Sequence, residues 1–220
     1  MFSPADYAYM SHALRLAEKG LYSTAPNPRV GCVLVRNEQI VGSGWHEKAG
    51  QPHAEINALN NARAAARGAT AYVTLEPCGH FGRTPPCVSA LIAAGIANVI
   101  IAMEDPNPIV SGRGKALLEQ SGIAVQTGLL EAEARALNVG FIARMVDKKP
   151  WVRLKTAVSL DGKTALKNGV SQWITGEAAR QDGHQWRARS CAIMTGIGTV
   201  KLDNPQLTVR HIETRRQPKK

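Results

Sequence analysis

Apolar and polar positions along the first 150 residues follow patterns that switch between helical and strand-like periodicity. In residues 4–17 apolar side chains recur every three or four positions, which predicts a helix that ends before Gly20. Residues 30–35 form a continuous apolar stretch rich in β-branched side chains, and residues 40–45 follow it after a short turn at 36–39. They predict two strands joined as a hairpin.

After this hairpin the pattern alternates between the two kinds of element. Helices are expected at 54–66, 86–94, 114–120 and 131–145, and strands at 70–75, 98–102 and 123–126. This order predicts an α/β fold of three layers around a mixed sheet.

A charged stretch that ends in proline, DKKP at 147–150, marks a boundary. We therefore expect one domain at 1–146, a linker at 147–150 and the beginning of a second domain at 151–220. The stretch WVRLKTAVSLDGKTA, which follows the boundary, predicts that this second domain opens with a strand.

The net charge of +10 raises the question of a nucleic-acid partner. Residues 1–150 contain 14 Lys+Arg against 12 Asp+Glu, whereas residues 151–220 contain 13 against 5. The excess positive charge therefore lies in the second region, where it suits a phosphorylated ligand as well as it suits nucleic acid. We expect no nucleic-acid partner.

Other bulk features predict a cytoplasmic protein without a membrane segment. The chain has no run of eighteen apolar residues and no basic start followed by an apolar core. Four cysteines in 220 residues do not make a disulfide scaffold, so two of them call for another explanation.

A possible metal site explains two of these cysteines. His53, Cys78 and Cys87 offer one imidazole and two thiolates, a mixture that zinc favours, and three protein ligands leave a fourth position open. Zinc lowers the pKa of a bound water to about 7. Glu55 is the candidate for moving protons beside it, provided that His53 lies at an irregular helix start, because residues two apart on a regular helix face different directions.

Each part of this pattern has an ordinary structural interpretation. An isolated His-Ala-Glu is usually part of a surface helix, and an isolated cysteine is usually a small buried apolar residue. Here H-x-E is followed by P-C and a further C, each at the end of a predicted element. This combination matches the zinc-deaminase signature and favours a zinc site.

The strings PHAE and EPC resemble the cytidine-deaminase superfamily. Eight residues, GHFGRTPP, separate the two cysteines, and EPCGHFGRTPPC is similar to the deaminase half of the bifunctional riboflavin-biosynthesis deaminase/reductase family. The stretches APNPRVGCVLV, GWHEKAGQPHAE and EDPNPIVSGRG agree with that resemblance.

The resemblance implies a cytidine-deaminase-like domain that deaminates 2,5-diamino-6-(5-phosphoribosylamino)pyrimidin-4-one by hydrolysis, with Glu55 moving the proton. It also implies a homo-oligomer. Further residues are candidates for contacting this phosphorylated pyrimidine, although each could equally make local turn contacts. They are Asn27, His46, His80 and Arg83.

The second region resembles the start of the same family's reductase, which has a dihydrofolate-reductase-like α/β fold and uses NADPH. The matching strings are LKTAVSLDGKTA, SQWIT and TVKLDNPQLTVR. By this resemblance NADP meets Ala157, Trp173, Thr199 and Asp203. The reductase substrate meets Ser171, Arg187, Leu207 and Arg210. The family continues for well over another hundred residues, so we expect residues 151–220 to be a truncated reductase domain, active only when complete.

Two other functions are compatible with parts of the sequence. A tRNA-editing deaminase shares the zinc chemistry but predicts a shorter cysteine spacing and a basic deaminase surface. A zinc-stabilised binding module predicts four protein ligands and leaves Glu55 without a role.

Overall fold

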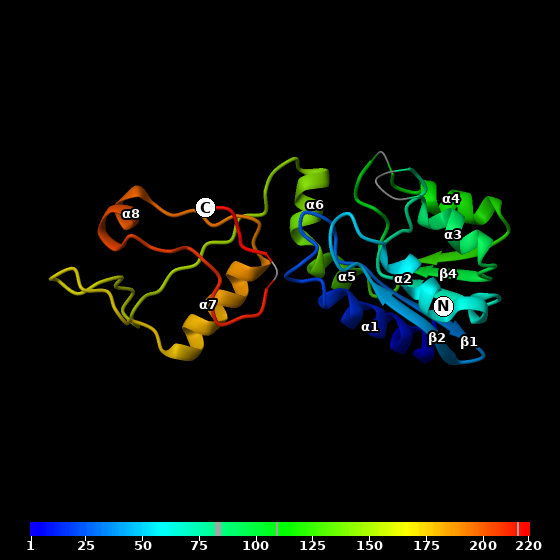
Figure 1. Ribbon diagram of the computed structural model, residues 1–220, viewed down its shortest axis with the longest axis horizontal. Coiled ribbons are helices and arrows are strands. Elements are labelled where there is room, and N and C mark those ends of the chain that lie inside the picture. The colour runs from blue at the N-terminus through cyan, green and yellow to red at the C-terminus, as the bar shows by residue number, and fades with distance from the viewer. Residues whose placement is uncertain (82–84, 109, 215) are drawn as a thin grey trace. The chain divides into compact units, whose positions relative to one another are not determined.

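The computed structural model of the chain describes residues 1–81, 85–108, 110–214 and 216–220 (Figure 1). The chain divides into two compact units, Met1–Trp151 and Val152–Lys220, which we describe separately.

The first unit is built on a five-stranded sheet in the order β2-β1-β3-β4-β5. The strands are β1 (Gly31–Arg36), β2 (Gln39–Trp45), β3 (Thr70–Val73), β4 (Asn98–Ile101) and β5 (Ala124–Thr127). Strand β1 pairs antiparallel with β2 and β3, whereas β3, β4 and β5 run parallel. The predicted mixed sheet is confirmed.

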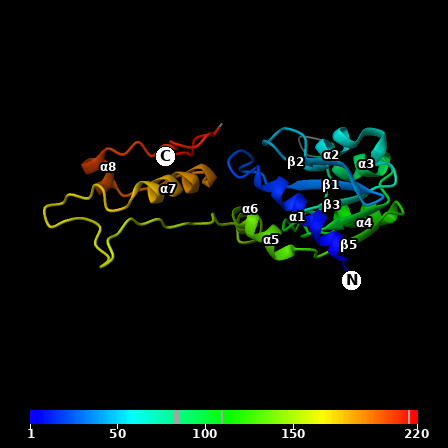
Figure 2. The ribbon, with the colours of Figure 1, turned by 90° about the horizontal axis from the view of Figure 1, so that it is seen from below.

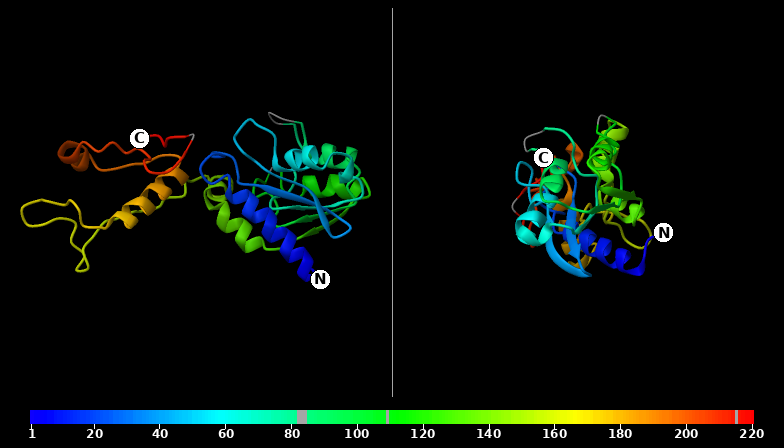
Figure 3. Two further views of the ribbon diagram at one scale, coloured as in Figure 1. Left: turned by 60° about the horizontal axis from the view of Figure 1, so that its bottom comes forward. Right: turned by 90° about the vertical axis from the view of Figure 1, so that its right-hand side faces the viewer.

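Helices cover both faces of this sheet. They are α1 (Pro4–Glu18), α2 (Ala54–Ala62), α3 (Cys87–Ala93), α4 (Arg113–Gln120), α5 (Glu131–Leu137) and α6 (Val139–Val146), with the 3₁₀ turn η1 (Arg63–Ala66) after α2. Helix α1 packs on one face and contacts α5, while α2, α3 and α4 contact one another in turn on the other (Figures 2 and 3). The expected three-layer arrangement is therefore also confirmed.

Glycines on β2 let α2 approach the sheet closely. A β-carbon on Gly44 would lie 2.5 Å from the Ala58 nitrogen and 2.6 Å from the Ala54 oxygen. A β-carbon on Gly42 would lie 2.5 Å from the Ala58 oxygen. No larger residue fits between the backbones at these positions, so the glycines fix the height of α2, and with it the helix start, above the sheet.

The helix expected over 131–145 is two helices. The break lies at Asn138, which has φ −117° and ψ 19° and ends α5 while it precedes α6. Its buried side chain accepts a hydrogen bond from the Arg29 nitrogen (2.8 Å) and donates to the Arg29 and Ala134 oxygens (3.0 and 3.3 Å). Asn138 thus connects the start of α6 to the segment before β1.

The second unit contains α7 (Glu177–Arg189) and α8 (Ile197–Asp203). The strand expected after Trp151 is wrong, because residues 151–159 form no regular structure. A strand forms only against a hydrogen-bonding neighbour, and the described part of residues 152–220 offers no named strand as a partner, only an isolated bridge from Ala192 to Lys219. In the described residues of both units no helix has the length and apolar character that crossing a membrane requires.

Candidate metal centre

Three side chains that are distant in sequence gather at one point of the first unit. The His53 Nδ1 atom lies 3.2 Å from the Cys87 sulfur and 3.6 Å from the Cys78 sulfur. All three candidate ligand atoms lie within 4.8 Å of one another. They therefore face a common point that one small cation can occupy.

The fold explains why these residues meet. His53 is the extended N-cap residue of α2, Cys78 follows the end of β3, and Cys87 is the first residue of α3. Ligands in α/β sheets commonly bind beyond the carboxyl ends of the strands, where these loops and helix starts converge. The irregular helix start on which the His53–Glu55 pairing depends is present, because His53 lies outside the helical conformation.

The two thiols hold their charge unequally. A hydrogen bond from the Cys87 thiol lowers the pKa of Cys78 to about 4, and His53 adds to this effect. The same pairing, together with burial, raises the pKa of Cys87. The backbone N–H of Cys87 also donates to the Cys78 sulfur at 3.3 Å, so a thiolate is stabilised there at neutral pH.

This donor set fits zinc. One imidazole nitrogen and two sulfurs, with a thiolate already favoured, are the ligands that zinc prefers, and three protein donors leave one position open. His53, Cys78 and Cys87 would hold the ion.

Glu55 lies beside this centre in the first turn of α2 and is only 3% exposed. Burial raises the pKa of Glu55 to about 7, and the nearby His53 offsets only part of that rise. A carboxyl group with this pKa exists in both protonation states near neutral pH, which is the property that a proton carrier needs.

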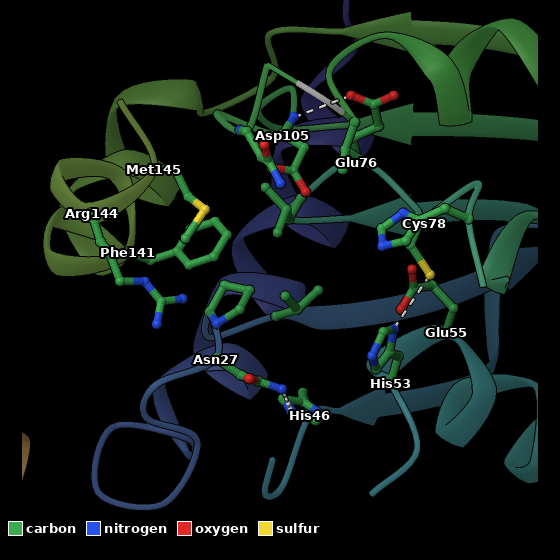
Figure 4. A pocket seen from close by; sticks show the side chains of 16 residues that line it. Asn27, His46, His53, Glu55, Glu76, Cys78, Asp105, Phe141, Arg144 and Met145 are labelled. Carbon is green, nitrogen blue, oxygen red and sulfur yellow. Dashed lines mark hydrogen bonds between the residues drawn. The ribbon is translucent and has the colours of Figure 1, made fainter. Parts of the chain in front are cut away.

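A cavity of about 300 Å³ opens next to the three ligands (Figure 4). His53, Glu55 and Cys78 line one side of it, and Phe141, Arg144 and Met145 of α6 line another. The volume matches the lower end of the range for small-molecule sites.

Asn27 and His46, two of the expected substrate contacts, also line the cavity and bond to each other. The buried His46 ring places Nδ1 3.1 Å from the Pro52 oxygen and Nε2 3.1 Å from the Asn27 amide nitrogen. Because a carbonyl only accepts, Nδ1 carries the proton and Nε2 accepts from Asn27. His46 therefore orients Asn27, whose Oδ1 is the acceptor left for a ligand.

His80, the third expected contact, is exposed and lines the cavity. Arg83, the fourth, lies outside the described residues. The substrate-binding roles of all four residues remain predictions.

Glu76 belongs to the site although the sequence analysis gave it no role. Its carboxylate is 3% exposed and lines the cavity. It accepts four backbone N–H groups at 2.9–3.2 Å, those of Asp105, Gly112, Gly114 and Lys115. The sequence does contain a sign of this role: Glu76 directly follows an apolar stretch that is predicted to be a buried strand. A buried carboxylate there needs hydrogen-bond donors as partners.

In the described part of the second unit, the residues expected to contact NADP do not form an enclosed cofactor site. Trp173 is 72% exposed and stacks under the Arg180 guanidinium at 4.7 Å. Thr199 and Asp203 are exposed on α8, which buries none of its residues, and Ala157 is half-buried. Their roles stay predictions.

The residues expected to contact the reductase substrate are exposed or half-buried. Arg210 is exposed, whereas Ser171, Arg187 and Leu207 are half-buried. The Arg187 guanidinium donates to the Thr208 oxygen at 3.1 Å. Their substrate roles likewise remain predictions.

Comparison with known proteins supports this architecture. Residues 3–103 match the family described as cytidine and deoxycytidylate deaminase zinc-binding region, and residues 150–220 match the RibD C-terminal domain. The riboflavin biosynthesis protein RibD of Escherichia coli is 55% identical over 208 residues, which cover 94% of this chain and 57% of that protein. The chain belongs to the RibD family.

Solved RibD structures show the same fold. Acinetobacter baumannii RibD matches with a TM-score of 0.94 at 53% identity, covering 97% of this chain and 62% of that one. The diaminohydroxyphosphoribosylaminopyrimidine deaminase/5-amino-6-(5-phosphoribosylamino)uracil reductase of Thermotoga maritima matches with a TM-score of 0.92 at 45% identity, covering 97% and 61%. The chain thus spans somewhat more than half the length of the RibD relatives it matches.

Proposed function

We propose that residues 1–151 catalyse the zinc-dependent hydrolytic deamination of 2,5-diamino-6-(5-phosphoribosylamino)pyrimidin-4-one in riboflavin biosynthesis. The observation that carries the proposal is the convergence of His53, Cys78 and Cys87 beside the buried carboxyl group of Glu55, at a cavity that His53, Cys78 and Glu55 line. RibD family membership supports this choice of substrate.

In this proposal Glu55 moves the protons of the reaction. Zinc, when bound, lowers the pKa of a water molecule in the open fourth position. Glu55 accepts a proton from the attacking water and delivers it to the amine that leaves. Water oxygen thereby replaces the amino group on the ring carbon, and ammonia departs. The pKa of about 7 suits Glu55 to both transfers.

Asn27 would orient the pyrimidine. Its Oδ1 is an acceptor suited to a ring or exocyclic N–H, because His46 fixes the opposite side of the amide. The buried side chains of Val30 and Leu75 and the half-buried ring of Phe141 line the cavity and limit the access of competing water.

We propose NADPH-dependent reduction only for the longer members of the family. The match to the RibD C-terminal domain supports it. The exposed positions of Trp173, Thr199 and Asp203 do not by themselves make a cofactor site. A cytoplasmic location, a homo-oligomeric assembly and the absence of a nucleic-acid partner are likewise proposed.

The test is ammonia release from the phosphorylated diaminopyrimidinone by protein stripped of metal and then restored with zinc. We expect no activity after stripping and recovery with about one zinc per chain. A folded, zinc-loaded chain that releases no ammonia would exclude the proposed function. Deamination of a tRNA instead would favour an editing enzyme.

A further inference from the structure

The cavity has a positively charged residue on the wall formed by α6. Among its described lining residues, Arg144 is the one with a permanent positive charge, because the remaining basic groups there are the histidines 46, 53 and 80. In Figure 4 its guanidinium lies across the cavity from His53 and Cys78. A ligand that reaches from the metal ligands to α6 would therefore end beside Arg144.

No acidic side chain neutralises this guanidinium in the part of the chain that the structure describes. The ion pair formed there joins Arg135 to Glu131. The three carboxylates that line the cavity are engaged elsewhere. Glu76 accepts four backbone N–H groups, Asp105 accepts the Asn107 backbone N–H at 2.8 Å, and Glu55 lies at the metal ligands. The charge of Arg144 is available to an anionic ligand.

The Arg144 guanidinium contacts Pro26 and Phe141 and keeps further N–H donors for a ligand. One terminal nitrogen, Nη2, donates to the Pro26 oxygen at 3.2 Å, and the Phe141 ring centre lies 5.8 Å from the Arg144 Cζ. Asn138 anchors the start of α6 through Arg29, so the backbone that carries Arg144 is also fixed. An arginine offers five N–H donors in a planar fork that matches the oxygens of a phosphate group.

We propose that Arg144 binds the phosphate group of the substrate and so makes the deaminase selective for a phosphorylated over an unphosphorylated pyrimidine riboside. The inference rests on the proposed deamination, which places the amino-bearing ring at His53, Cys78 and Cys87. With the ring at that side of the cavity of about 300 Å³, the proposal places the sugar phosphate toward the wall that Phe141, Arg144 and Met145 form. Arg144 acts there as a specificity residue and takes no part in proton transfer.

The test compares ammonia release from the phosphorylated substrate and from its dephosphorylated form. The proteins are the full chain and its Arg144→Gln and Arg144→Lys variants. In Arg144→Gln we expect kcat/KM for the phosphorylated substrate to fall by about 10- to 100-fold, the usual effect of losing hydrogen bonds to a charged group. We expect kcat/KM for the dephosphorylated substrate to stay within about twofold. Lysine should restore part of the preference, because it keeps the charge but not the fork.

Arg135→Gln is the matched control, because it removes an exposed arginine of α5 that does not line the cavity. It should leave both rates unchanged. Zinc content and thermal unfolding, measured for each variant, separate a loss of phosphate contact from a loss of fold. If Arg144→Gln unfolds the chain, Arg144→Lys alone must still show the reduced preference.

Two results would overturn the inference while leaving the proposed function intact. One is an unchanged phosphate preference in folded Arg144→Gln. The other is a loss of preference that occurs in Arg83→Gln and not in Arg144→Gln, which would assign the phosphate to Arg83. A wild-type chain that releases no ammonia from either substrate would remove both the inference and the function on which it rests.

Discussion

Two buried carboxylic acids near the cavity perform different tasks because their partners differ. Glu55 and Glu76 are each 3% exposed. Glu76 meets four backbone N–H donors, which fix it as an acceptor, whereas burial raises the pKa of Glu55 to about 7. Glu76 is therefore a positioning residue that holds the loop after β4 and the start of α4, while Glu55 is able to exchange a proton.

Replacing Glu76 by Gln should destabilise the protein and loosen the cavity. The amide nitrogen cannot accept, so at least one buried N–H loses its partner, and we expect the free energy of unfolding to fall by about 1–3 kcal/mol. Urea unfolding measures this loss, and KM for the phosphorylated substrate should rise. Glu119→Gln, on the exposed side of α4, is the control. Equal stability of the two variants would contradict the positioning role.

Replacing Cys87 by Ser should remove most of the zinc. A serine hydroxyl is a far weaker zinc ligand than a thiolate, so metal analysis after gel filtration should show well below one zinc per chain. Cys191→Ser is the control, because Cys191 is exposed and lies in the second unit. If Cys87→Ser retained full zinc while Cys191→Ser lost it, the assignment of the centre would be wrong.

For individual residues, the sequence predicts the features that depend on neighbouring positions. It does not predict contacts between residues that are distant along the chain. Proline, cysteine and the H-x-E spacing predict the three residues that meet and the irregular start at His53. Glu76 meets backbone groups 29–39 positions further along the chain, and Asn138 meets Arg29 across 109 positions. Spacing does not reveal such pairings, because they depend on which loops return to the same strand ends.

At the scale of elements, helix α2 carries both His53 and Glu55 to the cavity, and its packing on β2 sets their position. Replacing Gly44 by Ala forces a methyl group against the α2 backbone, since its β-carbon would lie 2.5 Å from the Ala58 nitrogen. Overpacking of this kind usually lowers stability by about 1–3 kcal/mol. We expect a lower unfolding midpoint together with reduced zinc content.

Gly183→Ala is the matched control, because Gly183 lies within α7 and a β-carbon there has open space up to 4.0 Å. Alanine in a helix interior should maintain or increase stability. A Gly44→Ala protein with unchanged zinc content and unchanged midpoint would contradict the account of how α2 is positioned.

The periodicity of apolar residues predicted the elements of the first unit well, but it did not reveal their breaks. The hairpin and the alternating helices and strands are present close to the expected residues. The helix expected over 131–145 divides at Asn138, because that side chain bonds to Arg29. The apolar pattern continues across the break, so periodicity alone could not find it.

At the scale of the whole molecule, the two units differ in how completely their backbones are paired. The first unit holds its strands in a continuous sheet. Between Val152 and Gly176 the described backbone forms turns, at Ser159–Lys163 and Leu166–Val170, and no helix or named strand. A strand could be expected there from the residues, but a strand without a partner is not stable.

Limited trypsin digestion should therefore cleave first between Lys155 and Lys167, where exposed lysines lie in this turn-rich segment. Such cleavage requires only local opening, which is least costly where few backbone hydrogen bonds exist. Mass spectrometry should find a resistant fragment that contains β1 to β5 and retains zinc. Initial cleavage inside the sheet would contradict this difference between the units.

The proposed deamination requires that Glu55 transfers protons beside a zinc ion held by His53, Cys78 and Cys87. The most direct measurement determines zinc content and ammonia release together, for the wild-type chain and for Glu55→Gln, with the exposed Glu47→Gln as control. We predict about one zinc per chain in all three proteins and a loss of about 10²- to 10⁴-fold in rate for Glu55→Gln alone. A zinc-loaded Glu55→Gln protein that deaminates the substrate at the wild-type rate would contradict this role of Glu55.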